Sequence, residues 1–259
     1  MPLILCYLPE RYMAKCSNLL LLTLSFQVIG ILIPYISVLQ KNIFSPPLPF
    51  ISQTVGFSPE CGIFTFFLVP GSFFGIIVCF IIHKTCKIQG QELIENTSFF
   101  FGTLYFLSWV FLCAAPFTFT DLPNKYEWVL TVLSVHMFGA LLMLASSVFF
   151  VISQAMLYWN CEVSPDYHPY RCKMSFITAP AAFIGIFALA ALGFEELTND
   201  EGQTMEKMIY LLPTKLSSKY IITALCEWTL TLSMWFTLLT YYNEMDKKKF
   251  YLKIKRKTL

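Results

Sequence analysis

Long apolar segments alternate along the chain with short polar ones. Six of the apolar segments have about 20 residues or more, which is the length that a helix needs to cross a bilayer. They are Ser17–Leu39, Gly62–Ile82, Phe99–Phe119, Trp128–Leu157, Met174–Phe194 and Tyr220–Tyr242. Because backbone polar groups in lipid must be satisfied within the segment itself, each is expected to be a helix. The pattern predicts an all-α, polytopic membrane bundle of six transmembrane helices.

The composition agrees with this prediction. The 259 residues are 56% hydrophobic and only 13% charged, whereas about 25% of the residues of a soluble globular chain are charged. Membrane lipids are therefore the first expected partners. The net charge is only +2, and the basic residues flank the predicted spans rather than forming a stripe with aromatic residues, so we expect no binding to nucleic acid. Residues 1–259 are interpreted as a single transmembrane domain that ends in a basic tail, 243–259.

The basic residues are divided unevenly between the two sides of the predicted membrane. With the loops assigned alternately, one side carries 13 of the 18 Lys and Arg residues, in the N-terminal segment, 83–98, 158–173 and the tail. The positive-inside rule places this side in the cytosol, so both termini are expected to be cytosolic. The opposite, lumenal or external, side would then hold the loops at about 40–61, 120–127 and 195–219.

Two of the predicted spans contain polar residues that are costly to place in hydrocarbon. His136 and Gln154 are 18 residues apart in the fourth span. This is five helical turns, so both side chains are expected to face the same way, towards other helices. His136 and Glu227, which precedes Trp228, lie 8 and 7 residues from the lumenal starts of their spans. The two groups are thus expected at similar depth, where they can form a pair.

Two interpretations of this polar centre stay open. In the first, it is a clasp that fixes how the helices pack. In the second, it responds to protons or to a ligand, because a buried Glu–His pair exists either as an ion pair or as two neutral groups. The second interpretation favours a proton- or lipid-coupled transporter or channel.

The sequence offers no catalytic constellation. Its histidines are His83, His136 and His168, and only one of them would lie on the lumenal side, too few for a zinc hydrolase. No Ser or Cys stands in a nucleophile-elbow context, and there is no glycine-rich phosphate cradle. We therefore expect no enzyme activity, no catalytic residue, no metal and no cofactor. The spacing of Gly71 and Gly75 is interpreted as helix packing.

Three blocks of residues connect the chain to a known family. The first runs from Pro49-Phe-Ile-Ser52 to Ser58-Pro59-Glu60, the second is His136-Met-Phe-Gly-Ala140, and the third is Ala224-Leu-Cys-Glu227-Trp228. In the order and spacing of these blocks the chain resembles the DRAM, Frag and Sfk-type six-span membrane proteins. It departs from them at Gln53, where the family has Asp, and is interpreted as a divergent member.

Glu60 in the first block has two interpretations. It stands where the second span begins, and a carboxylate there is favoured by the helix dipole and can cap free N–H groups. Alternatively, it contacts a ligand or the His136–Glu227 region on the lumenal side. The prolines before it, including Pro49 and Pro59, stiffen the loop that contains Ser52.

The resemblance implies a six-helix bundle in a lysosomal, Golgi, endoplasmic-reticulum or plasma membrane. It also implies roles in autophagy, lipid signalling or the maturation of glycolipid-anchored proteins. We therefore expect a non-enzymatic, multi-pass endomembrane protein that modulates autophagy or membrane lipid handling, with other membrane proteins as further partners. The alternatives are the transporter or channel and a lipid or glycolipid-anchor remodelling factor.

The end of the tail, Lys255-Arg256-Lys257, is similar to a cytosolic retrieval signal of the early secretory pathway. The other interpretation is that the basic tail sets the orientation of the protein and rests on anionic lipid.

Overall fold

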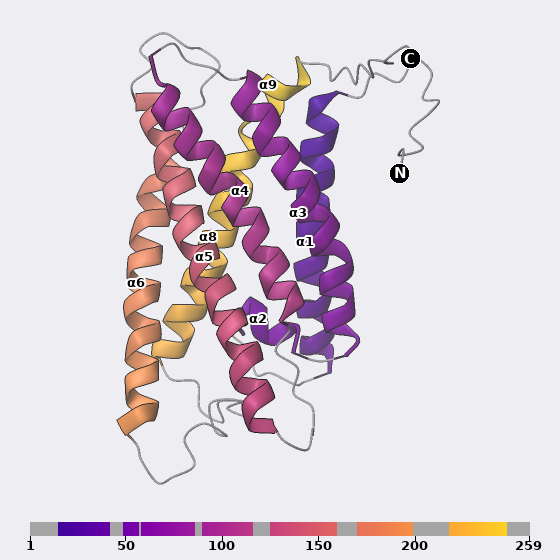
Figure 1. Ribbon diagram of the computed structural model, residues 1–259, viewed down its shortest axis with the longest axis vertical. Helices are drawn as coiled ribbons and strands as arrows, with labels where there is room; N and C mark the ends of the chain where they lie inside the picture. The colour runs from indigo at the N-terminus through magenta and orange to yellow at the C-terminus, as the bar shows by residue number, and fades with distance from the viewer. Residues whose placement is uncertain are drawn as a thin grey trace, which may run out of the picture.

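The computed structural model is a bundle of long helices that lie side by side (Figure 1). The structure describes residues 15–41, 49–56, 58–85, 90–115, 125–159, 170–198 and 218–247. The long helices are α1 (Cys16–Gln40), α3 (Glu60–Thr85), α4 (Glu92–Ala114), α5 (Lys125–Trp159), α6 (Tyr170–Thr198) and α8 (Ser218–Leu239). Two short helices, α2 (Ile51–Thr54) and α9 (Tyr242–Asp246), lie at opposite ends of the bundle. The all-helical prediction is confirmed for this part of the chain.

Five helical segments are long and apolar enough to cross a membrane: Cys16–Gln40, Glu60–Lys84, Glu92–Ala114, Ser134–Leu157 and Ile221–Asp246. They correspond to the predicted spans one to four and six. The fifth predicted span, Met174–Phe194, lies within α6. The retrieval-like end of the tail lies outside the described residues.

Helix α4 is displaced towards the N-terminus relative to its prediction. It begins at Glu92 rather than near Phe99, and ends at Ala114. Its first turn contains Glu92 and Glu95, which the positive end of the helix dipole favours, so the helix extends into a polar segment that an apolar window does not detect. It ends just before Ala115, which precedes a proline in the sequence, where helices commonly stop.

Small residues bring the neighbouring helices close together. A Cβ on Gly71 would lie 2.9 Å from Cβ of Phe26 on α1, and a Cβ on Gly75 would run into the ring of Phe106 on α4. Gly139 on α5 approaches α4 in the same way, since its Cβ would lie 3.2 Å from Phe111. The interpretation of Gly71 and Gly75 as helix-packing residues is therefore confirmed, and α3 packs between α1 and α4.

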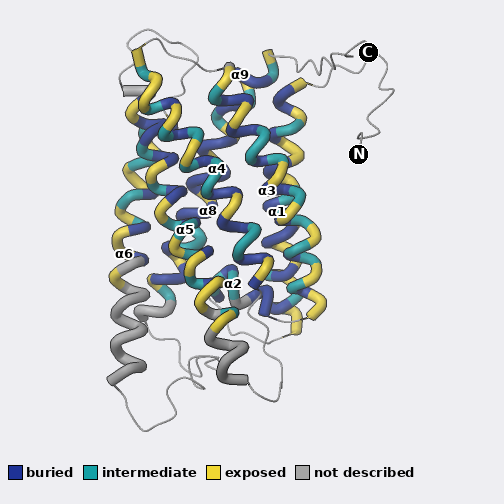
Figure 2. Tube along the Cα trace, in the orientation of Figure 1, coloured by how far each residue is buried: buried dark blue, intermediate teal, exposed yellow. Residues whose placement is uncertain are grey.

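The outer surface of the bundle carries many large apolar side chains. Exposed positions recur along the described parts of the long helices (Figure 2), and they include large aromatic residues such as Phe66 and Phe176, each 70% exposed. Apolar surface of this extent does not occur on soluble monomers. It is the surface expected of helices that face lipid tails. In such proteins the interior differs from the lipid-facing surface by its close packing and its polar contacts.

Candidate functional site: polar clusters at the two ends of the bundle

At the end of the bundle that holds α2, two side chains of α8 hold the backbone of the loop before α3. Glu227 Oε2 accepts a hydrogen bond of 2.9 Å from the N–H of Ile51, the first residue of α2. The N–H of Ser52 also faces this carboxylate. The Trp228 indole N–H donates to the carbonyl oxygen of Pro49 at 3.1 Å. The first N–H groups of a helix have no partner within it, so a carboxylate is well suited to cap them.

A second contact at this end ties α1 to α3 through Glu60. One oxygen of its carboxylate, Oε1, accepts hydrogen bonds of 2.5 Å from Ser37 Oγ and from Lys41 Nζ. Glu60 is fully buried, whereas the side chain of Lys41 is 42% exposed. Glu60, which follows Pro59 at the start of α3, thus joins two helices in addition to standing at a helix N-terminus.

The end of α1 contributes a further contact to the same region. The rings of Tyr35 and Trp228 meet edge to face, with 5.3 Å between their centres. Tyr35 and Ser37 belong to Pro34-Tyr-Ile-Ser37, a segment that merely repeats the start of the first family block in sequence. In the structure it lies against the partners of that block. We use the name α2-end cluster for the residues that make these contacts: Tyr35, Ser37, Lys41, Glu60, Glu227, Trp228 and residues 49–52.

The predicted pair of His136 and Glu227 is not what the structure shows. His136 Nδ1 lies 3.1 Å from the carbonyl oxygen of Ala115, at the end of α4, while Glu227 binds the N–H of Ile51. Each side chain is bound to a backbone group at a helix terminus, where such groups lack a partner within their own helix. The prediction that His136 and Gln154 both face other helices is confirmed, since the two residues are only 6% and 1% exposed.

Gln154 belongs to the opposite end of the bundle, about 27 Å along α5 from His136 at 1.5 Å per residue. Its Nε2 group donates to Ser98 on α4, and its Oε1 atom accepts from the hydroxyl of Tyr241, which follows α8. These two hydrogen bonds connect three helical segments through one buried amide. Buried amides need such partners, because an unpaired one is costly in a medium without water.

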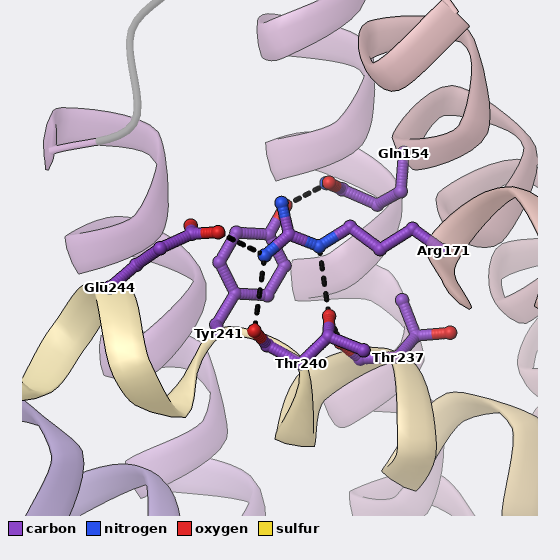
Figure 3. Close-up of polar contacts among 6 residues, drawn as sticks. All are labelled: Gln154, Arg171, Thr237, Thr240, Tyr241 and Glu244. Carbon is purple, nitrogen blue, oxygen red and sulfur yellow. Dashed lines mark hydrogen bonds and ion pairs between the residues drawn. The ribbon is translucent and has the colours of Figure 1, made fainter. Parts of the chain in front are cut away.

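Next to Gln154, the guanidinium of Arg171 is buried among side chains from the end of α8 and from α9 (Figure 3). Its Nη2 lies 2.6 Å from Glu244 Oε1, and its Nε donates to Thr240 Oγ1 at 2.8 Å. Its central carbon lies 3.6 Å from the centre of the Tyr241 ring. A buried cation is tolerated only with a counter-ion and hydrogen bonds of this kind. We call Ser98, Gln154, Arg171, Thr240, Tyr241 and Glu244 the α9-end cluster.

A small cavity of about 20 Å³ adjoins this cluster, lined by Ser98, Gln154 and Tyr241 together with His83 and Glu95. Space of this size holds a water molecule. The two clusters therefore offer hydrogen bonds and charge for positioning.

The geometry brings the first and third sequence blocks into direct contact, and comparison with known proteins shows the family of the chain. Residues 16–248 match the family model described as Frag1/DRAM/Sfk1/Cwh43P N-terminal domain. The chain belongs to this family. It is 27% identical over 244 residues to human DNA damage-regulated autophagy modulator protein 1, covering 93% of this chain and 94% of that protein. The mouse protein of the same name is 26% identical over 244 residues, which again cover 93% of this chain and 94% of that protein. No solved structure matches the chain.

For this member of the Frag1/DRAM/Sfk1/Cwh43P family, sequence reasoning missed most of the α9-end cluster. The sequence predicts Arg171 only as a basic residue of a cytosolic loop and places Glu244 in the tail. The two are 73 residues apart, so no local spacing relates them. The sequence feature that could have indicated this cluster is a single arginine in the first turn of an apolar helix. The charge count includes this arginine only as evidence for orientation.

Proposed function

We propose that this protein is a non-enzymatic, multi-pass protein of the endomembrane system that modulates autophagy or membrane lipid handling by interaction. Support comes from the family to which the chain belongs and from the names of its relatives, which are autophagy modulators. The proposed partners are membrane lipids and other membrane proteins. The proposed location is the lysosome or the endoplasmic reticulum and Golgi.

The observation that carries the proposal is the contact between the first and third sequence blocks. Glu227 and Trp228 use their polar atoms to hold backbone groups of Ile51 and Pro49. A carboxylate engaged in this way positions a loop and is not free to act on a substrate. The two blocks thus shape one end of the protein, and we propose that this end is what a partner recognises.

Six spans with both termini in the cytosol are part of the proposal. Lys15, just before α1, contacts Asp246, the last residue of α9, so the described chain starts and finishes at the same end of the bundle. This requires an even number of crossings. The five apolar spans together with α6 give six. The excess of basic residues on that side favours the cytosol. Access of an antibody to a C-terminal tag after selective permeabilisation of the plasma membrane tests the orientation.

Autophagic flux in cells that lack the endogenous protein tests the function. We expect the wild-type chain to restore flux and Glu227→Ala to restore little of it, because the loop loses the acceptor that caps α2. Lys84→Ala, at an exposed position on α3, is the control and should behave as wild type. Trp228→Phe, which keeps the ring against Tyr35 but loses the N–H, should give an intermediate result.

Expression and location must be compared for each variant. A Glu227→Ala protein that reaches the same membrane at the same level and still restores flux fully would contradict the proposal.

A further inference from the structure

A third group of polar side chains lies between the two clusters, in the middle of the bundle. Gln27 Nε2, Ser72 Oγ, Tyr105 Oη and Trp109 Nε1 are buried and have no hydrogen-bond partner among the residues that the structure describes. None of these four residues is more than 1% exposed. Buried polar groups are nearly always bonded to protein or to water, and inside a membrane an unbonded one is especially costly.

Other buried hydroxyls of the bundle are satisfied by their own helices. Ser146 and Ser153 on α5 and Thr237 on α8 donate to backbone carbonyls of the preceding turn at 2.6–2.8 Å. Ser72 has the same option within α3, because a serine in a helix can bond the carbonyl three or four residues earlier. It makes no such bond, and its hydroxyl has no other partner among the described residues.

The packing of α1 against α3 brings Gln27 and Ser72 to the same level. A Cβ on Gly71, the neighbour of Ser72, would lie 3.7 Å from Gln27 Cγ. The carbonyl oxygen of the Gln27 side chain accepts a hydrogen bond of 2.8 Å from the indole N–H of Trp235 on α8. This bond fixes the orientation of the Gln27 amide, so its NH₂ group points away from Trp235.

The packing of α3 against α4 adds the other two residues. Gly75 meets the ring of Phe106, and Gly102 meets Cys79. These contacts show that α3 and α4 pack closely, and the Trp109 ring also meets the Phe64 ring of α3 edge to face, with 6.0 Å between ring centres.

The two aromatic residues of α4 do not satisfy each other. Tyr105 and Trp109 lie one turn apart on the same face, with 6.2 Å between ring centres. The indole N–H of Trp109 approaches the Tyr105 hydroxyl without reaching hydrogen-bond geometry, and the hydroxyl's own proton has no acceptor among the described residues.

We propose that Gln27, Ser72, Tyr105 and Trp109 bind one or two internal water molecules midway through the bundle. Water suits this group because two of its members, Gln27 and Trp109, offer N–H donors, while the hydroxyls of Ser72 and Tyr105 both donate and accept. A water that accepts from the N–H groups and donates to the hydroxyl oxygens satisfies several of them at once, as buried waters typically make about three hydrogen bonds. Through Gln27 the water site connects α1, α3 and α4 to α8. The inference does not depend on the proposed function.

Two substitutions that each remove one hydroxyl test the site by thermal unfolding of the purified protein in detergent. If water binds there, Ser72→Ala and Tyr105→Phe each lower Tm by about 2–4 °C, the shift expected for the loss of one typical hydrogen bond in a chain of this size. The double variant lowers Tm by less than the sum, because both substitutions disturb the same water. Ser146→Ala, whose hydroxyl is satisfied within α5, provides the reference for losing an ordinary buried hydroxyl.

A dry interior gives the opposite result. An unpaired buried hydroxyl is then a cost, so Ser72→Ala and Tyr105→Phe would leave Tm unchanged or raise it relative to Ser146→Ala. This outcome overturns the proposal.

Radiolytic footprinting provides a direct probe, because hydroxyl radicals formed from a bound water oxidise the side chains beside it. We expect oxidation of Tyr105 and Trp109 despite their burial, and less oxidation of Trp109 in Ser72→Ala. Wild-type protein in which neither aromatic residue is oxidised would contradict the presence of water.

Discussion

The α2-end and α9-end clusters both join helices that are distant in sequence, but they do so with different chemistry. At the α2 end, side chains of α8 mostly hold backbone groups of a loop, and the ion pair of Lys41 with Glu60 includes a partly exposed lysine. At the α9 end, side chains hold other side chains, and the ion pair of Arg171 with Glu244 is almost fully buried. The α2 end is therefore suited to presenting a loop, and the α9 end to fixing helices.

This difference predicts how the two ends respond to substitution. Contacts with loop backbone can be lost locally, whereas a buried ion pair leaves an uncompensated charge when one partner is removed. Loss of an α9-end residue should therefore destabilise the whole bundle, and loss of an α2-end residue should mainly release the loop.

The largest effect is expected from Arg171→Met. The substitution leaves Glu244 buried without its cation and should lower the free energy of unfolding by about 3–5 kcal/mol. Thermal or denaturant unfolding in detergent measures this loss. Lys173→Met, at an exposed position two residues away on α6, is the matched control and should have little effect.

The double variant Arg171→Met with Glu244→Met sharpens this test. Removing both charges should recover part of the lost stability, because a buried ion pair can often be replaced by apolar residues. If Arg171→Met alone is no more destabilising than Lys173→Met, the α9-end cluster does not fix the helices.

A smaller effect is expected from Lys41→Met at the other end. Lys41 is 42% exposed, so water already screens its attraction for Glu60, and Ser37 still donates to the carboxylate. We expect a loss of about 1–3 kcal/mol, the range for a hydrogen bond to a charged group. The same unfolding measurement compares it directly with Arg171→Met, and a larger loss than for Arg171→Met would reverse the ranking of the two ends.

Glu227→Ala should cost about 1–2 kcal/mol, as for the loss of a helix cap. Its clearest effect should be local. Hydrogen exchange at the Ile51 amide should become faster, because its acceptor is removed, while Glu227→Gln keeps an oxygen acceptor and should exchange more slowly than the alanine variant. Unchanged exchange in both variants would mean that the carboxylate does not hold the loop.

The difference between the ends also explains what could be predicted from the sequence. Helices could be predicted because runs of about 20 apolar residues in lipid have no other regular form. Helix α4 differs from its prediction at both ends, because acidic residues favour an earlier start and a proline in the sequence follows its end. Glu227 could be identified as a carboxylate inside an apolar run, while Trp228 and Glu60 lie in blocks that resemble those of the family. Burial of His136 and Gln154 followed from helical periodicity.

The partners of these residues could not be predicted in the same way. The residue counts from the span ends place His136 and Glu227 at the same depth in the membrane. Equal depth does not determine in which direction each side chain points around its helix axis. It also does not determine whether a backbone group binds the side chain instead. Arg171 finds Glu244 across 73 residues, and only the packing of α6 against α8 brings them together. The contact of Ser37 with Glu60 could not be predicted either, because the segment around Ser37 has no Pro-Glu after it like that of the first block.

The smallest effect is expected where α1 meets α9. Lys15 Nζ lies 3.0 Å from Asp246 Oδ2, but the two side chains are 52% and 34% exposed, and exposed pairs contribute little to stability. Lys15→Met should therefore leave Tm nearly unchanged at physiological salt, with a small decrease that appears only at low ionic strength, where screening is weaker. Ser17→Ala, which removes the second donor to Asp246, is the companion variant, because its hydroxyl is buried and its effect should not depend on salt. A large decrease in Tm in Lys15→Met that does not depend on salt would mean that the exposed Lys15–Asp246 pair stabilises the bundle as much as the buried Arg171–Glu244 pair. The stability of the α9 end would then depend on both pairs.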